Sequence, residues 1–286
     1  MIYVLASAIC SVLVSVLLKL ARRFGLDVGQ MVAWNYAMAC VLAALLLRPA
    51  LAPLRAPGAP WFALAGLGVL LPVIFLALGA SVRHAGIVRS EVAQRLSLLL
   101  SLLAAFALFG ERLDATKALG CALGLLALLG MVWRADSARG EGGSASWLWP
   151  LLVFAGFGTI DVLFKRVAAA GVPLGTSLLA MFALALPVAL VLAMWQRRRG
   201  GARFSLRNLL GGLLLGLLNF GNIFFYLRAH RALPHDPALV FASMNLGVVV
   251  LGALAGVLLF RERLSRLNFA ALLLALLAIV LLTRGG

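Results

Sequence analysis

Few side chains inside the apolar stretches of this chain can do chemistry, and the carboxylic acid of Asp161 is one of them. It lies in the segment FGTIDVLFK, four residues before Lys165. An acid surrounded by hydrocarbon can exchange protons and so couple an ion gradient to the movement of a solute. The same spacing also allows an i,i+4 ion pair with Lys165 that only anchors the end of a helix. Both interpretations stay open, and the first makes Asp161 a candidate for proton coupling.

A second charged group consists of Glu91 and Arg95, which are one helical turn apart in RSEVAQRL. The two side chains can neutralise each other as a structural pair. Alternatively, they offer partners for the two charges of a zwitterionic substrate such as an amino acid. Gln94 lies between them, and Asn245 is its counterpart in the second copy of the internal repeat described below. Two amides at equivalent depth can face one shared cavity.

Further amides and aromatic rings occur in two other apolar stretches. Asn219 and Asn222 are three residues apart in LNFGNIFFY, which places both amides on one helix face. They can line a water-filled pathway or hydrogen-bond to a neighbouring helix. Trp34 beside Asn35 suits a cavity for a small organic solute, although plain packing also explains the tryptophan. The predicted substrate-binding residues are Trp34, Asn35, Glu91, Gln94, Arg95, Asn219, Asn222, Tyr226 and Asn245.

The motifs of enzymes and of metal-binding proteins are absent from the sequence. It has no phosphate-binding loop, no nucleophile motif and no His/Glu spacing suited to a metal. The three cysteines, Cys10, Cys40 and Cys121, lie in apolar stretches without metal-like spacing. We therefore expect no enzyme activity, no catalytic residue, no metal and no cofactor, so an ion gradient would supply any energy needed.

The elements that must position these side chains are predicted to be membrane helices. Hydrophobic residues make up 64% of the 286 positions, far above the roughly 45–50% of soluble domains. Continuous Leu/Ala/Val runs of about 20 residues predict spanning helices rather than a membrane barrel. The sequence contains ten such stretches: Ile2–Leu18, Val28–Leu47, Trp61–Ala80, Ile87–Phe109, Ala115–Val132, Trp147–Phe164, Leu174–Trp195, Leu209–Tyr226, Ala238–Phe260 and Leu267–Thr283.

The net charge of +16 does not point to a nucleic-acid partner, because the basic residues come in twos and threes at the ends of the predicted spans. Their ordinary role there is topology and anchoring. The longest cluster, Arg197–Arg199 with Arg203 and Arg207, is suited to anionic lipid. We expect a small-molecule substrate and membrane lipid as partners, and a monomer or a weak homo-oligomer.

An internal repeat organises the chain. Leu103–Leu113, LAAFALFGERL, matches Leu254–Leu264, LAGVLLFRERL, at seven of eleven positions with an offset of 151 residues. The sequence is therefore interpreted as two five-span copies, residues 1–134 and 147–286, joined by a Gly/Ser-rich linker at 135–146. Because five is odd, the second copy enters the membrane from the opposite side, which predicts an inverted-topology repeat.

The positions of small residues predict which helices of the two copies pack against each other. Gly120 and Gly124 in the fifth span fall at the positions of Ala271 and Ala275 in the tenth. Small residues at this spacing let membrane helices approach closely. We therefore expect the fifth and tenth spans to pack against each other.

These features resemble the drug/metabolite transporter superfamily, EamA type, over essentially the whole chain. The resemblance rests on the five-plus-five repeat, on Lys19 and Lys165 closing spans one and six, and on Glu-Arg-Leu at 111–113 and 262–264. In that family the Glu-Arg-Leu pair marks the fold, which makes Glu111 and Glu262 poor catalytic candidates. The family commonly has Trp-Gly eight and seven residues before the first lysine, where this chain has Ser11-Val12.

The resemblance implies an all-α membrane protein of ten transmembrane helices and a secondary transporter of small metabolites such as amino acids. An exporter working by alternating access around a site near the membrane midplane is the leading hypothesis. A flippase for lipids or lipid-linked carriers is the first alternative, and a membrane scaffold without transport activity is the second. The expected location is a bacterial cytoplasmic membrane.

The orientation of the termini receives conflicting signals. The loops on the side opposite the termini carry more Lys and Arg than the loops on the same side. The positive-inside rule therefore places both termini outside, whereas the family resemblance implies cytoplasmic termini.

Overall fold

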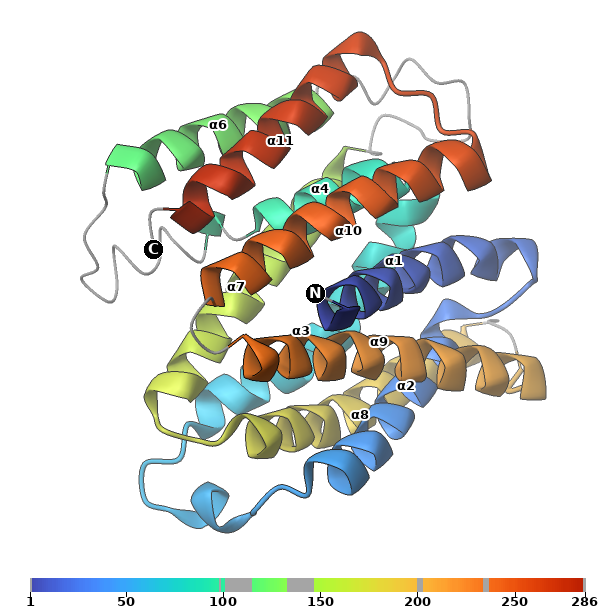
Figure 1. The fold of residues 1–286 in the computed structure, drawn as a ribbon. Helices are drawn as coiled ribbons and strands as arrows, with labels where there is room; N and C mark the ends of the chain where they lie inside the picture. The colour runs from blue at the N-terminus through green and yellow to red at the C-terminus, as the bar shows by residue number, and fades with distance from the viewer. Residues whose placement is uncertain are drawn as a thin grey trace. The chain divides into compact units, whose positions relative to one another are not determined.

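Helices are the regular elements in the computed structural model, which describes residues 2–97, 99–100, 115–132, 147–199, 203–233 and 237–284 (Figure 1). A π-helical turn η1 (Ala43–Leu47) continues α2, and a short 3-10 helix η2 (Ala52–Arg55) precedes α3. The predicted all-helical class is confirmed for these residues, while the ten-span count and the inverted topology stay predictions. The α-helices are α1 (Ile2–Arg23), α2 (Val28–Leu42), α3 (Trp61–His84), α4 (Ile87–Leu96), α6 (Ala115–Val132), α7 (Leu148–Ala169), α8 (Leu174–Arg198), α9 (Leu206–Ala232), α10 (Pro237–Phe260) and α11 (Arg266–Arg284).

Six segments of the described chain are long enough and apolar enough to cross a membrane. Each has at least 18 residues and a strongly apolar window of that length, which suffices to cross the hydrocarbon layer. A multi-pass membrane protein is therefore the class that the structure supports. The six segments are Ile2–Ala21, Val28–Leu47, Trp61–His84, Leu174–Arg198, Leu206–Ala232 and Ser243–Phe260.

Several helices extend beyond their predicted apolar stretches. α1 ends at Arg23 rather than Leu18, and α9 covers Leu206–Ala232 rather than Leu209–Tyr226. Hydropathy marks only the part of a helix that suits hydrocarbon, whereas backbone hydrogen bonding continues through flanking polar residues. For the fourth predicted span, residues 101–109 lie outside the described residues, as does the linker at 135–146.

The described chain divides into two compact units, and the boundaries fall inside α1, α3, α7 and α9. Unit 1 consists of Met1–Val16, Ala77–Gly158 and Gly221–Gly286, and unit 2 of Leu17–Leu76 and Thr159–Phe220. Both units combine segments from the two predicted copies. The copies are defined by sequence similarity rather than compactness, so their bounds at 1–134 and 147–286 stay a prediction.

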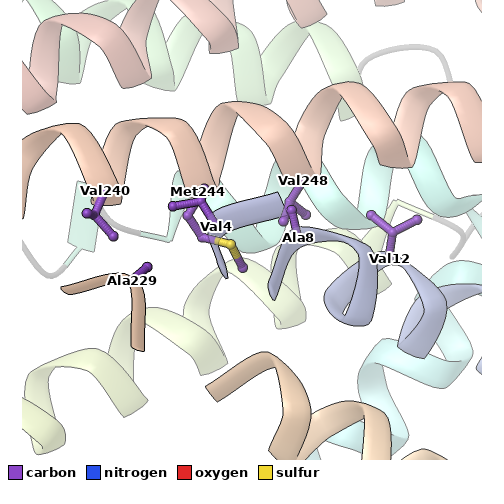
Figure 2. Close-up of a cluster of buried hydrophobic side chains, with 7 residues drawn as sticks. All are labelled: Val4, Ala8, Val12, Ala229, Val240, Met244 and Val248. Carbon is purple, nitrogen blue, oxygen red and sulfur yellow. The ribbon is translucent and has the colours of Figure 1, made fainter. Parts of the chain in front are cut away.

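A core of matching apolar ridges holds α1 against α10 in unit 1. Val4, Ala8 and Val12 follow one another at four-residue spacing on α1, as Val240, Met244 and Val248 do on α10 (Figure 2). Ala229 of α9 completes this buried cluster. Residues four apart form a continuous ridge on a helix, so the two series can interlock along their length.

Other contacts in unit 1 join helices that the sequence places at equivalent positions of its two copies. α6 packs along α11, and α4 packs on α10 (Figure 1). The expected pairing of the fifth and tenth predicted spans is thus confirmed. At this interface Gly130 faces Ala271, because a methyl group added at Gly130 would lie 3.0 Å from Ala271 Cβ. Gly124 instead leaves room for Leu99 of the fourth predicted span.

Unit 2 is built around the contact of α2 with α8. Tyr36 of α2 is buried there between the rings of Phe75 and Phe182, whose centroids lie 6.0 Å and 6.2 Å from its own. The first half of α9 also approaches α2 closely. Side chains at Gly212 and Gly216 of α9 would collide with the backbone of α2, so glycine is needed at both positions. These contacts position the Asn35 amide.

Candidate functional site

The charged pair predicted on α4 is buried inside unit 1. The side chain of Glu91 is fully buried, and that of Arg95 is 13% exposed. Their closest charged atoms, Glu91 Oε2 and Arg95 Nη2, are 4.0 Å apart. That separation is at the outer limit of an ion pair, so opposite charges face each other without a short hydrogen bond between these two atoms.

Three buried serines on α1 supply hydrogen-bond partners for polar side chains of unit 1. Ser15 Oγ donates to Glu91 Oε1 at 2.5 Å, and Arg95 Nη2 donates to Ser11 Oγ at 2.7 Å. Ser7 Oγ contacts the carbonyl oxygen and Oδ1 of Asn222, each at 2.8 Å. These serines were not among the predicted site residues. Their four-residue spacing within an apolar helix was the signal that one face of α1 is polar.

One carboxylate oxygen of Glu91 is left available by these contacts. Oε2 is buried and accepts no hydrogen bond from the described residues. A buried polar atom without a partner costs about 1–3 kcal/mol, and charges inside a membrane protein generally mark a functional pathway. The arrangement can therefore accept a donor group, such as an ammonium, from a bound solute.

α10 provides the space that the Glu91 side chain occupies. A methyl group added at Gly252 would lie 2.8 Å from Glu91 Cγ. One turn further along α10, a methyl group added at Gly256 would lie 2.8 Å from Glu262 Oε2 and 2.7 Å from Val88 Cγ2. The two glycines of α10 thus each make room for a carboxylate, and for Glu91 this fixes where the carboxylate can lie.

The side chain of Glu262 caps the N-terminus of α4. Its Oε1 accepts from the backbone N–H of Ile87 at 2.7 Å, and its Oε2 accepts from that of Val88 at 3.3 Å. A carboxylate at this place satisfies amides that have no partner within the helix and complements the helix dipole. The residue before the helix, Gly86, has a φ of +95°, a conformation suited to glycine. The structural role expected for Glu262 agrees with this contact, while Glu111 lies outside the described residues.

The remaining predicted residues of unit 1 have more ordinary surroundings. Gln94 is partly exposed, and its backbone carbonyl accepts from Ser97 Oγ at 2.6 Å. Asn245 is buried on α10. Tyr226 packs against the apolar cluster of Figure 2 and meets the His230 ring edge-on at 4.6 Å. A role of these three in binding stays a prediction.

Asn219 and Asn222, which the sequence places on one face of α9, contact different partners. Asn222 bonds to Ser7 in unit 1, whereas Asn219 Nδ2 donates to Asn35 Oδ1 at 3.1 Å in unit 2. Asn35 is fully buried, and its Nδ2 has no hydrogen-bond partner among the described residues. The structure therefore brings the predicted pair Asn35 and Asn219 together.

Two predicted residues of unit 2 are less enclosed. Trp34 is partly exposed. Its Cβ packs against Gly212 of α9, where an added methyl group would lie only 2.5 Å from it. Asp161 lies within α7 and is also partly exposed. Neither placement decides between a functional and a packing role.

The chemistry available at the α4 pair is recognition of charge. A carboxylate, a guanidinium and two hydroxyls meet within unit 1, at the level of Ser11, which is near the middle of the first apolar stretch. Within the part of the chain that the structure describes, no three His, Cys, Asp or Glu side chains gather as metal ligands would. The set matches the two ends of a zwitterion better than a metal or a phosphate.

Three comparisons relate the chain to known proteins. The model of the EamA-like transporter family matches residues 1–133. An uncharacterized protein of Haemophilus influenzae is 38% identical over 278 residues, which are 95% of this chain and 94% of that protein. A solved protein crystal structure superposes with a TM-score of 0.56 at 18% identity, covering 97% of this chain and 95% of that one. The last similarity shows the fold alone.

Proposed function

Because the chain belongs to the EamA-like transporter family, whose members move small solutes across membranes, we propose that it is a secondary transporter that exports zwitterionic metabolites such as amino acids. The observation that carries this proposal is the buried Glu91–Arg95 pair with its open carboxylate oxygen. The two charges lie 4.0 Å apart, too close to hold a solute between them, so the two side chains have to separate for Glu91 to bind an ammonium and Arg95 a carboxylate.

Asymmetry between the two copies supports a single charged site. With the offset of 151 residues, Glu91 and Arg95 correspond to Ala242 and Leu246. Ser11, which accepts from Arg95, stands where the family commonly has tryptophan. A small hydroxyl-bearing residue there can accept a hydrogen bond from the guanidinium, which a tryptophan could not do. We expect alternating access of the two copies in a bacterial cytoplasmic membrane to expose this site to each side in turn.

Binding is tested on detergent-purified protein by a thermal-shift screen of amino acids, nucleosides, sugars, lipophilic cations and lipid head groups, because a ligand of the folded state raises its stability. We expect a selective response to amino acids. Glu91→Gln should weaken that binding about tenfold or more, since a hydrogen bond to a charged group contributes about 1.5–3 kcal/mol. Arg95→Lys should weaken it as well, because lysine lacks the planar fork of the guanidinium.

The matched control for Arg95→Lys is Arg55→Lys, which changes an exposed arginine of η2 and should leave binding unchanged. Counterflow of the selected amino acid into liposomes then measures transport by the same variants. Equal amino-acid binding by wild type and Glu91→Gln would contradict the proposed site. A response to lipid head groups alone would favour the flippase alternative over a solute transporter.

Proton coupling is assigned to Asp161 as part of this proposal, because an acid within an apolar helix can carry a proton. Asp161→Asn should retain counterflow, which needs no gradient, and should lose accumulation driven by an imposed proton gradient. The measurement compares both modes in the same liposomes. Gradient-driven accumulation at the wild-type level would remove Asp161 from the coupling mechanism and leave the substrate site unaffected.

A further inference from the structure

Five exposed arginines lie at the junction of α8 and α9: Arg197 and Arg198 end α8, Arg199 and Arg203 follow it, and Arg207 is in the first turn of α9. The sequence holds no acidic residue between Asp161 and Asp236. Within the described ranges, none of the five arginines forms an ion pair. Five guanidinium groups within eleven residues, with no carboxylate among them, produce a concentrated positive potential that favours an anionic partner.

Aromatic and apolar side chains stand beside these cations. The guanidinium of Arg199 lies 4.1 Å from the centroid of the Trp195 ring, and that of Arg197 lies 5.4 Å from that of Phe204. Both rings are exposed, and Leu206 at the start of α9 is 67% exposed. Exposed aromatic residues at the ends of apolar helices are typical of the membrane interface. The surroundings therefore suit a partner with a charged head and an apolar body.

A network in unit 2 fixes the backbone that carries the arginines. Gln30 Nε2 donates to the carbonyl of Arg203 at 3.3 Å, and Asn208 Nδ2 donates to Gln30 Oε1 at 2.8 Å. The backbone N–H of Asp27 donates to Asn208 Oδ1 at 3.0 Å, while Asp27 Oδ1 caps α2 by accepting from Gln30 N–H. Gln30 and Asn208 are buried. These bonds hold the connection at Arg203 and at the first turn of α9.

We propose that this arginine surface, defined by the five arginines with Trp195 and Phe204, binds the head groups of anionic phospholipids. The guanidinium groups hydrogen-bond to phosphate oxygens in a fork-like geometry, and the rings lie at the boundary of the acyl chains. A soluble phosphate fits less well, because it would leave the exposed rings and Leu206 without a partner. The inference does not depend on which solute the protein transports.

The test titrates detergent-purified protein with phosphatidylglycerol and measures lipid retention by native mass spectrometry. The variant replaces Arg197, Arg198 and Arg199 with glutamine. Attraction to an anionic surface contributes about 1 kcal/mol for each basic residue, so we expect the apparent affinity for phosphatidylglycerol to fall about fivefold per arginine, on the order of 100-fold for three. Phosphatidylcholine should bind weakly to both proteins.

A matched triple variant with Arg55→Gln, Arg83→Gln and Arg231→Gln makes the same change in net charge at exposed positions elsewhere. It should retain the wild-type affinity for phosphatidylglycerol. An equal loss in the two triple variants would overturn the proposal, because net charge alone would then explain the binding. Equal retention of phosphatidylcholine by the wild-type protein would overturn it as well.

Glycerol phosphate distinguishes a lipid from a free phosphate as the source of the anion. We expect little thermal stabilisation by glycerol phosphate at concentrations where phosphatidylglycerol saturates. Equal stabilisation by the two would replace the lipid surface with a soluble-phosphate site. The amino-acid screen of the proposed transport site uses different variants, so either proposal can fail without the other.

Discussion

Arg95→Met is expected to lower the free energy of unfolding by about 3–5 kcal/mol, because removing one member of a buried ion pair leaves the other charge uncompensated. Glu91 is fully buried, and Ser15 would remain as the hydrogen-bond donor to its Oε1. One hydroxyl cannot replace a positive charge beside a fully buried carboxylate. Denaturant unfolding in a fixed detergent at neutral pH measures the loss.

The double variant Glu91→Gln with Arg95→Met separates stability from recognition. It removes both charges at nearly constant volume, so we expect it to recover most of the stability lost in Arg95→Met. It should still fail to bind the amino acid selected by the screen. Arg55→Met at an exposed position should change the stability by less than about 0.5 kcal/mol. Equal stabilities of the single and double variants would contradict a coupled pair.

Glu262→Ala is expected to cost about 2–4 kcal/mol, because it leaves two buried helix amides without acceptors. Those amides belong to Ile87 and Val88, at the first turn of α4. Glu262→Gln keeps one carbonyl oxygen and should lose about half as much. Thermal unfolding measures the stability, and hydrogen exchange of the Ile87 and Val88 amides reports the cap directly.

The neighbouring substitution Arg263→Ala is the matched control for Glu262→Ala, because Arg263 is exposed in the same connection. It should leave both the unfolding temperature and the exchange of these amides unchanged. Unchanged protection of the Ile87 amide in Glu262→Ala would contradict the capping role. Since α4 carries Glu91 one turn after Ile87, the cap also fixes the start of the helix that bears the charged pair.

The sequence predicted the helices and the charged pair because both are local patterns. Apolar runs located the start of α2 at Val28, and residues 115–132, predicted as the fifth span, are helical throughout. The four-residue spacing of Glu91 and Arg95 put both side chains on one helix face, and the structure places them 4.0 Å apart. Such information is contained in a few consecutive residues, so no tertiary contact is needed to find it.

The partners of these residues depend on contacts between distant segments. A serine in a membrane helix ordinarily hydrogen-bonds to a carbonyl of its own helix, so Ser11 and Ser15 gave no chemical signal by type alone. The pairing of Glu262 with Ile87 spans 175 residues of sequence. Its existence depends on how α10 and α4 pack, which hydropathy does not specify. The role of Glu262 was therefore predicted only from the family resemblance.

The two ridges of α1 restrict how that helix can turn. Val4, Ala8 and Val12 meet α10, while Ser7, Ser11 and Ser15 bond to side chains of α9 and α4. Ridges three residues apart differ by about 60° around a helix axis. Rolling α1 by that angle would press hydroxyls into the valine cluster and methyl groups against Glu91. The two sets of contacts together fix the rotation of α1 about its own axis, so α1 can keep both sets only by moving without rotating about that axis.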